Sequence, residues 1–496
     1  MSSPPKVDPA GQSNSLPPIE IDEVSFLVRA QKFRISATAM RRSPISLATE
    51  YAIRLIHLVP EIGPDAIGEY FGFEEVETRV LLQDILETGL VLENSGRLTL
   101  SARGYEAISP VSEELEIFTR EEIRTSQSFD LIALAPADEV SIDPSIARRI
   151  PEIAIPDREK AANAASQIGR AFEDHFLEWR QRNGTRNRTD DLKFEAADDV
   201  QQIKTFAAPF HISIQYHQED PVGLEPDFRP LQTKGKPGSR KPLIEALSAR
   251  LSSMRAPPDA DLGLRWLREI DGDLLSRAGF NGMSDVRSWM AKCQDETGRL
   301  LTHPYDPGLR LGGSISGRFV RNALIDWTRL QAPSDPTPLF WIPPHADYWG
   351  KSLAFAAAVR ELSAQETEGI VLMARNGLGT REANWWRRTF GRSDKHNSLF
   401  DRCVGVSSDL PKSLEVIVKP NSWALALVHT TESRSGLPLP IGYITADNVV
   451  VQAVTRAMAD VASTAPSSNA MLWIRQDETP DAALNAIDTA LGIETV

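Results

Sequence analysis

An acid followed further along the chain by an acid-x-lysine run is a pattern that can hold a metal ion against a scissile phosphate. Asp157 and the run Asp191-Leu192-Lys193 have this composition. Metal binding by this pattern needs the first acid and the acid-x-lysine run on neighbouring strands. Asp157 and the run over 191–193, however, stand beside sequence of helical character. His211 and His217 are also metal-ligand types, but six residues of strand span about 20 Å, which is too far for one ion. We therefore predict no metal and no cofactor, and a metal-dependent nuclease is kept as an alternative.

The glycines between residues 312 and 317 have the spacing of a phosphate-binding loop. The run Gly312-Gly313-Ser314-Ile315-Ser316-Gly317 lacks the lysine that meets the β- and γ-phosphates and the Ser or Thr that holds Mg²⁺. The pattern therefore indicates an ordinary loop with spare glycines.

Two basic stretches could contact phosphates, and the second, which includes Trp385 and Trp386, mixes cations with aromatic rings as single-strand binders do. The candidate phosphate or nucleic-acid contacts are Lys234, Lys236, Arg240, Lys241, Arg387, Arg388, Arg392 and Lys395. The competing explanations are a solvated linker for the first stretch and a partner-binding patch for the second.

Strand and helix patterns from Pro338 to Ala462 predict an α/β domain, in which strand, helix, strand over 339–374 implies a parallel pair. This order resembles one phospholipase D-type repeat, a family whose late hairpin carries His-x-Lys, with the histidine as nucleophile and the lysine on the phosphate. None of the eight histidines has a lysine two residues on, and His429-Thr430-Thr431 stands nearest to the expected place. The resemblance thus implies a repeat that has lost its catalytic pair, and we predict no catalytic residue.

Composition places the chain among water-soluble globular proteins. It has 496 residues, 41% of them hydrophobic and 25% charged, with a net charge of −14. Such an acidic chain cannot coat nucleic acid with its whole surface, so any DNA contact must be a local patch. Two cysteines build no disulfide framework, and no apolar run approaches the roughly 20 residues of a membrane span. We expect a cytoplasmic protein without membrane contact.

The segment from Ser43 to Ile108 predicts three helices followed by a hairpin. Ser43-Pro44 is a helix start, Gly63-Pro64 separates the first helix from a short second one, and Gly89 closes a third over 74–88. The third helix has five apolar positions that we predict to face inward: Val76, Val80, Leu81, Ile85 and Leu86. Two apolar segments flank Asn94-Ser95-Gly96 as strands flank a tight turn.

This order of elements resembles the winged helix-turn-helix family. The resemblance implies that the helix over 74–88 enters a DNA major groove and that the turn after Asn94 contacts the backbone, with the upstream cations as a basic arm. The candidate DNA contacts are Arg29, Lys32, Arg34, Arg41, Arg42, Thr78, Arg79, Gln83 and Arg97. Carboxylates on the outer side of the third helix would oppose phosphates, so a protein-docking winged helix is an equal alternative.

Together these patterns predict a multidomain α+β chain with an N-terminal winged helix-turn-helix, a helical middle and a C-terminal α/β domain with a mixed sheet. The expected divisions are a disordered tail over 1–20, the winged helix with its basic arm over 21–125, a helical or mixed middle domain over 126–220, a linker over 221–257, a helical segment over 258–335 and the α/β domain over 336–496.

The leading hypothesis is a non-catalytic component of a bacterial, DNA-linked multi-protein system, in antiviral defence or genome maintenance. It would dock on DNA or on other protein subunits. One alternative is a DNA-acting hydrolase with an atypical site, either phospholipase D-like or metal-dependent. The other is a structural adaptor subunit.

Overall fold

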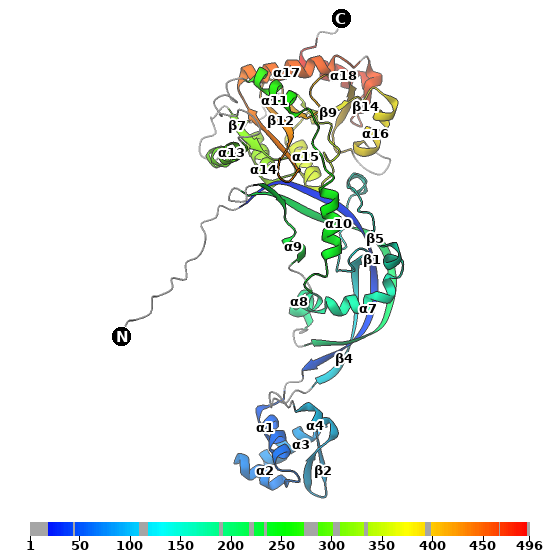
Figure 1. Ribbon diagram of the computed structural model, residues 1–496, viewed down its shortest axis with the longest axis vertical. Helices are drawn as coiled ribbons and strands as arrows, with labels where there is room; N and C mark the ends of the chain where they lie inside the picture. Colours follow the sequence, from blue (N-terminus) through cyan, green and yellow to red (C-terminus); the bar gives the residue numbers. More distant parts are fainter. Residues whose placement is uncertain are drawn as a thin grey trace, which may run out of the picture.

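The computed structural model describes residues 18–42, 45–108, 118–187, 192–217, 223–232, 236–271, 286–300, 308–331, 336–391, 398–465 and 467–493. They form an elongated molecule with a compact α/β body at one end, a small helical unit at the other and a long sheet between them (Figure 1). The predicted mixed α/β character is confirmed. Most of the predicted tail lies outside the described residues, as do Ser43 and Pro44.

The long sheet has four antiparallel strands in the order β4-β1-β5-β6. Their bounds are β1 (Ile19–Arg42), β4 (Phe118–Asp130), β5 (Leu192–His217) and β6 (Gly223–Pro226). Phe33, Ile35 and Ala37 are buried on one face of β1, as the two-residue period of a strand requires. The predicted basic arm is therefore the middle and end of β1, paired on both sides, and the sheet crosses the expected boundary between residues 125 and 126.

Four helices cover part of this sheet: α5 (Pro144–Ala147), α6 (Arg158–Ala162), α7 (Ala164–Asp174) and α8 (Phe176–Asn187). Ile168, Phe172 and Trp179 recur at helical spacing and pack with Phe33 and Phe129 in one core cluster. These helices lie within the predicted helical or mixed middle domain over 126–220, which also contains strand β5.

Residues 45–108, here called the inserted unit, fold between the end of β1 and the start of β4, which pair with each other up to Arg42 and Phe118. The unit contains α1 (Leu47–Leu58), α2 (Pro64–Phe71), α3 (Glu75–Glu87), β2 (Val91–Asn94), β3 (Arg97–Leu100) and α4 (Ala102–Ala107). The predicted order of three helices and a hairpin is confirmed. It occupies the tip of a long β-hairpin (Figure 1).

The inward face of α3 differs from the prediction. Leu81 and Ile85 are buried with Ile53 of α1 in the core of the inserted unit. Val76 and Val80, however, are 67% and 57% exposed. A helix of 13 residues presents only a narrow stripe to a small core, and these two valines lie outside that stripe.

The C-terminal body is built on an eight-stranded mixed sheet with the order β14-β10-β9-β8-β11-β12-β13-β7. Its strands are β7 (Gly308–Gly312), β8 (Leu339–Ile342), β9 (Ile370–Arg375), β10 (Arg402–Val406), β11 (Leu414–Lys419), β12 (Trp423–Thr431), β13 (Pro438–Thr445) and β14 (Met471–Trp473). The predicted parallel pairing of β8 with β9 is confirmed. Strand β7 was not predicted, because its five residues lie in a stretch that reads as helical.

Helices cover both faces of this sheet, so its strands are continuous apolar runs. One core cluster joins α14 (Arg318–Leu330), α15 (Leu353–Gln365) and α16 (Thr380–Phe390) to the sheet. The cluster on the other face includes α10 (Lys241–Leu251), α11 (Ala260–Ile270), α13 (Val286–Leu300), α17 (Asn448–Ala462) and α18 (Pro480–Leu491). The short elements α9 (Arg229–Gln232) and η2 (Ser468–Ala470) complete the described chain.

The predicted linker over 221–257 contains ordered structure where it is described. It includes β6 and α10, and Leu243, Leu247 and Leu251 of α10 are buried in the core. Pro242 stands in the first turn of α10, where proline is tolerated, so it begins a helix and does not interrupt one. Among the described residues, no helix is long and apolar enough to cross a membrane.

Candidate functional site

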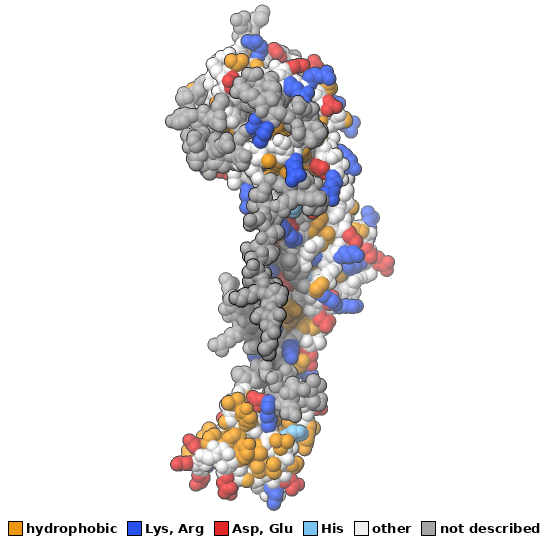
Figure 2. All heavy atoms as spheres, turned by 60° about the vertical axis from the view of Figure 1, so that its left-hand side comes forward, with side chains coloured by type: hydrophobic (Ala, Val, Ile, Leu, Met, Phe, Trp, Pro, Cys, Tyr) orange, Lys and Arg blue, Asp and Glu red, His pale blue; other side chains and the backbone are white. Residues whose placement is uncertain are grey.

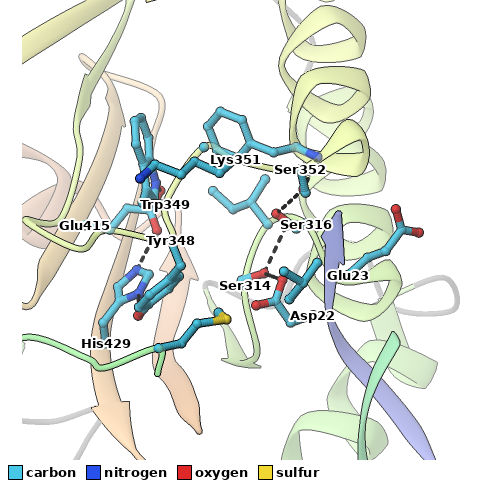
Figure 3. A pocket seen from close by; sticks show the side chains of 15 residues that line it. Asp22, Glu23, Ser314, Ser316, Tyr348, Trp349, Lys351, Ser352, Glu415 and His429 are labelled. Atoms are coloured by element: carbon cyan, nitrogen blue, oxygen red, sulfur yellow. Dashed lines mark hydrogen bonds and ion pairs between the residues drawn. The ribbon is translucent and has the colours of Figure 1, made fainter. Parts of the chain in front are cut away.

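Polar side chains from five segments meet at one edge of the C-terminal sheet (Figure 3). Strands β7, β8 and β12 run in the same direction, so their carboxyl ends share this edge with the amino end of β11. The amino end of β1, with Asp22, reaches the same place. The group, here called the polar cluster, consists of Asp22, Ser314, Ser316, Tyr348, Ser352, Glu415 and His429.

His429 is held from both sides. Its Nε2 lies 2.8 Å from Oε2 of Glu415, and its Nδ1 lies 2.7 Å from the hydroxyl of Tyr348. A carboxylate only accepts, so in the neutral ring Nε2 carries the proton and Nδ1 accepts from Tyr348. Both His429 and Glu415 are 1% exposed. The ring therefore has no nitrogen left for a substrate.

Glu415 is satisfied by neutral donors as well. Its Oε1 accepts from the indole nitrogens of Trp341 at 3.0 Å and Trp349 at 2.7 Å. Burial raises the pKa of Tyr348, whose hydroxyl keeps its proton and its bond to His429. Tyr348, His429 and Glu415 thus form one hydrogen-bond network, which Trp349 also joins. This network fixes the loop after β8 over the sheet.

Asp22 and the three serines face this network across the cluster (Figure 3). The Ser314 hydroxyl donates to Oδ1 of Asp22 at 2.5 Å, and the Ser352 hydroxyl donates to Ser316 at 3.1 Å. Burial raises the pKa of Asp22 to about 6, although Ser314 opposes the shift.

The glycines from 312 to 317 have a structural reason. Side chains at Gly313 and Gly317 would collide with the backbone at Ile21 of β1, and the backbone nitrogen of Ser314 donates to the carbonyl oxygen of Ile21 at 2.8 Å. The loop is where β1 docks on the C-terminal body. This agrees with the prediction that it is an ordinary loop.

The space left inside the polar cluster is a cavity of about 20 Å³. That is room for about one water molecule, far less than a phosphodiester needs. A hydrolase centred on His429 would need both a free ring nitrogen and room for its substrate, and this arrangement offers neither.

Where they are described, the residues considered as metal ligands form no common site. Asp157 caps α6 by accepting from the backbone nitrogen of Lys160 at 2.8 Å, and Asp191 lies outside the described residues. His211 lies 3.1 Å from the Ser25 hydroxyl, and burial lowers its pKa. In the described part of the chain, no three His, Cys, Asp or Glu side chains are grouped as metal ligands.

Three of the five arm cations form ion pairs within the long sheet and its loops. Arg29 pairs with Glu152 at 2.6 Å, Lys32 with Glu139 at 3.0 Å and Arg41 with Glu121 at 2.6 Å. Arg34 is exposed on β1, and the side chain of Arg42 is outside the described residues.

The predicted groove-facing residues of the inserted unit also have local partners. Thr78 is buried against Gly68 of α2. Arg79 pairs with Glu75 at 2.7 Å, and the Gln83 amide donates to Glu87 at 2.9 Å. Arg97 donates to the carbonyl oxygen of Glu61 at 3.1 Å.

The remaining basic candidates are spread over the molecule. Arg240 is buried and pairs with Glu178 at 3.0 Å, while Lys236 pairs with Asp174 at 2.9 Å. Lys241 lies 3.8 Å from Glu245. Arg387 donates to the carbonyl oxygen of Leu472 at 3.2 Å, and Arg388 is exposed. Lys234, Arg392 and Lys395 are outside the described residues.

Unlike the basic candidates, exposed apolar side chains gather in one place, the surface of the inserted unit (Figure 2). Of the seventeen large apolar side chains that are exposed among the described residues, nine belong to this unit: Leu47, Tyr51, Leu58, Val59, Tyr70, Val76, Val80, Leu92 and Tyr105. Eleven acids and four arginines between residues 45 and 108 give the unit a net charge of −7.

Most residues of the polar cluster were not predicted from the sequence. Glu415 interrupts the apolar run Leu-Glu-Val-Ile-Val of β11, and this signal could have found it. Asp22 and Tyr348 carry no such signal, because contacts across hundreds of residues bring them together. No family model, curated protein or solved structure matches the chain. The likeness to winged helices and to phospholipase D-type repeats therefore rests on the residues and elements described above.

Proposed function

We propose that this chain is a non-catalytic docking component of a multi-protein assembly, and that the inserted unit binds a protein partner. The observation that carries the proposal is the outer face of α3. Where a DNA reader needs cations, α3 presents Val76 and Val80 together with acids.

Electrostatics favours a protein over DNA as the partner. Binding to duplex DNA draws most of its non-specific affinity from cations that replace counterions on the phosphates. The inserted unit is acidic, and Arg79 on α3 is already paired with Glu75. A protein surface with an apolar centre and basic rim matches these features, because interfaces bury apolar side chains at the core and leave charges at the rim.

The position of the inserted unit supports the same proposal. Strand β1 has 24 residues, which at about 3.3 Å each span up to roughly 80 Å. Paired with β4 and β5, it holds the unit away from the C-terminal body (Figure 1). A rigid arm of this kind can present one surface to a partner while the body contacts another.

Two matched variants test the proposal. Val80→Glu places a charge on the outer face of α3, and Val449→Glu does the same on α17 at a valine that is 75% exposed. The full chain and both variants would be tagged and purified from cells of the native host, and co-purifying proteins quantified by mass spectrometry. We expect at least one protein to be lost with Val80→Glu and retained with Val449→Glu. Identical profiles for all three chains would contradict the proposal.

A further inference from the structure

A second and larger cavity opens beside the polar cluster, at the carboxyl ends of the parallel strands β8 and β9. Its volume is about 320 Å³, within the range of small-molecule sites. The loop after β8, the loop after β9 and the first turns of α16 line it. Trp349 and Lys351 line both cavities and so form the partition between them. In open α/β sheets, ligands bind outside the carboxyl ends of the strands.

One wall of this cavity is aromatic. Trp385 and Trp386 project from α16, and their rings meet edge to face with centroids 4.7 Å apart. Trp386 is buried, whereas Trp385 is 47% exposed. An exposed indole at the mouth of a cavity offers a flat apolar surface on which a planar ring can stack.

The other side of the cavity is basic. The guanidinium of Arg375, at the end of β9, donates to the carbonyl oxygens of Pro343, Leu410 and Leu414 at 2.7–2.8 Å. All of its described hydrogen-bond partners are neutral carbonyl oxygens. Burial lowers the pKa of Arg375 to about 10, and the nearby carboxylate of Asp259 opposes this shift without bonding to the guanidinium.

Two further cations and two acids complete the lining. Lys351 and Arg381 add to the charge of Arg375, while Asp347 and Glu382 offset part of it, which leaves an excess of one positive charge. The first turn of α16 contributes Arg381 and Glu382 to the lining, and the Glu382 carboxylate lies close to Gly379 at the start of the helix.

We propose that this cavity binds a nucleoside phosphate, with its base stacked on Trp385 and its phosphate near Arg375, Lys351 and Arg381. The planar ring accounts for the indole wall, and the anion accounts for the excess of positive charge in the lining. Arg381 and Trp385 are one helical turn apart on α16, so they lie on the same face and can engage two parts of one ligand. The basic residues Arg387 and Arg388, which the sequence singled out beside the tryptophans, do not line the cavity.

Calorimetric titration of the full chain tests this proposal. The probes are the monophosphates and the triphosphates of the four common ribonucleosides. Adenosine, which lacks the phosphate, and inorganic phosphate, which lacks the base, are the two half-ligands. We expect at least one nucleotide to bind with Kd below about 1 mM, and each half-ligand to bind about tenfold more weakly or not at all. Binding should also raise the Tm of the chain.

Three variants locate the site. Trp385→Ala and Arg381→Ala remove exposed side chains that line the cavity, and each should weaken binding about tenfold or more. Arg388→Ala changes an exposed arginine elsewhere on α16 and should alter binding less than about twofold. Retained Tm values would show that the variants fold. Absence of binding by every nucleotide at about 5 mM, or binding that survives both cavity variants, would overturn the proposal.

Discussion

The C-terminal body and the inserted unit differ in which side chains they bury and which they expose. In the C-terminal body, the charged and polar groups Glu415 and His429 are buried and bonded to each other. In the inserted unit, the valines of α3 are exposed to water. Buried polar groups with full sets of partners stabilise one arrangement of a domain, whereas clustered exposed apolar groups mark a surface that is completed by another molecule. This contrast is what motivates the proposal that a partner covers the inserted unit.

The largest effect is expected from removing the carboxylate at the centre of the body. Glu415→Ala would leave the indole nitrogens of Trp341 and Trp349 and the Nε2 of His429 buried without their acceptor. We expect a loss of roughly 3–5 kcal/mol in the free energy of unfolding, measured by urea denaturation. Glu75→Ala, on the exposed side of α3, is the control and should change it by less than about 0.5 kcal/mol. A similar small change for both variants would show that the network does not stabilise the body.

A pH-dependent effect is expected at Asp22. Burial raises the pKa of Asp22 from its ordinary value of 3.8 to about 6 in the folded chain. The folded chain therefore holds this proton more tightly than the unfolded chain does, and the protonated carboxyl stabilises the fold at low pH. That stabilisation is lost as the pH rises through 4 to 6, and above this window the fold contains a buried carboxylate. Asp22→Asn removes the titration and keeps an acceptor for Ser314.

We therefore expect Asp22→Asn to gain stability relative to the wild-type chain as the pH rises, by about 2 kcal/mol between pH 4 and pH 7. Urea denaturation of both chains at several pH values measures it. A difference that is constant with pH, or that favours the wild-type chain at neutral pH, would contradict the assignment.

The smallest effect on stability is expected at the exposed valines. Val80→Thr keeps the shape of the side chain and should change the free energy of unfolding by less than about 0.5 kcal/mol. Ile85→Thr, at a fully buried position of the same helix, should lower the free energy of unfolding by well over about 1 kcal/mol. Equal losses at both positions would mean that Val80 packs in the core of the inserted unit.

Local patterns predicted much of the fold. The helices and hairpin of the inserted unit and the strands from residue 339 onward follow from periodicity, prolines and glycines close to each element. Long-range pairing was not predicted: β1 pairs with β5 more than 150 residues away, which turns a predicted arm into the centre of a sheet. A stretch with several cations and no acid looks the same in a strand and in an unpaired arm.

The candidate site was less predictable than the fold. His429 was named from the sequence only as the histidine nearest to the place expected in a phospholipase D-type repeat, and its partners Tyr348 and Glu415 come from other segments. The exposure of Val80 depends on how few core residues the inserted unit has, and helical spacing alone does not fix it.

We propose that the inserted unit docks on protein and not on DNA. Fluorescence anisotropy of labelled duplex DNA, titrated with the purified full chain from about 50 mM salt upward, distinguishes these two partners. We expect no binding that depends on the inserted unit, even at the lowest salt. Binding that weakens steeply with salt, and that is reduced by Arg79→Ala or Arg97→Ala, would mean that the inserted unit docks on DNA.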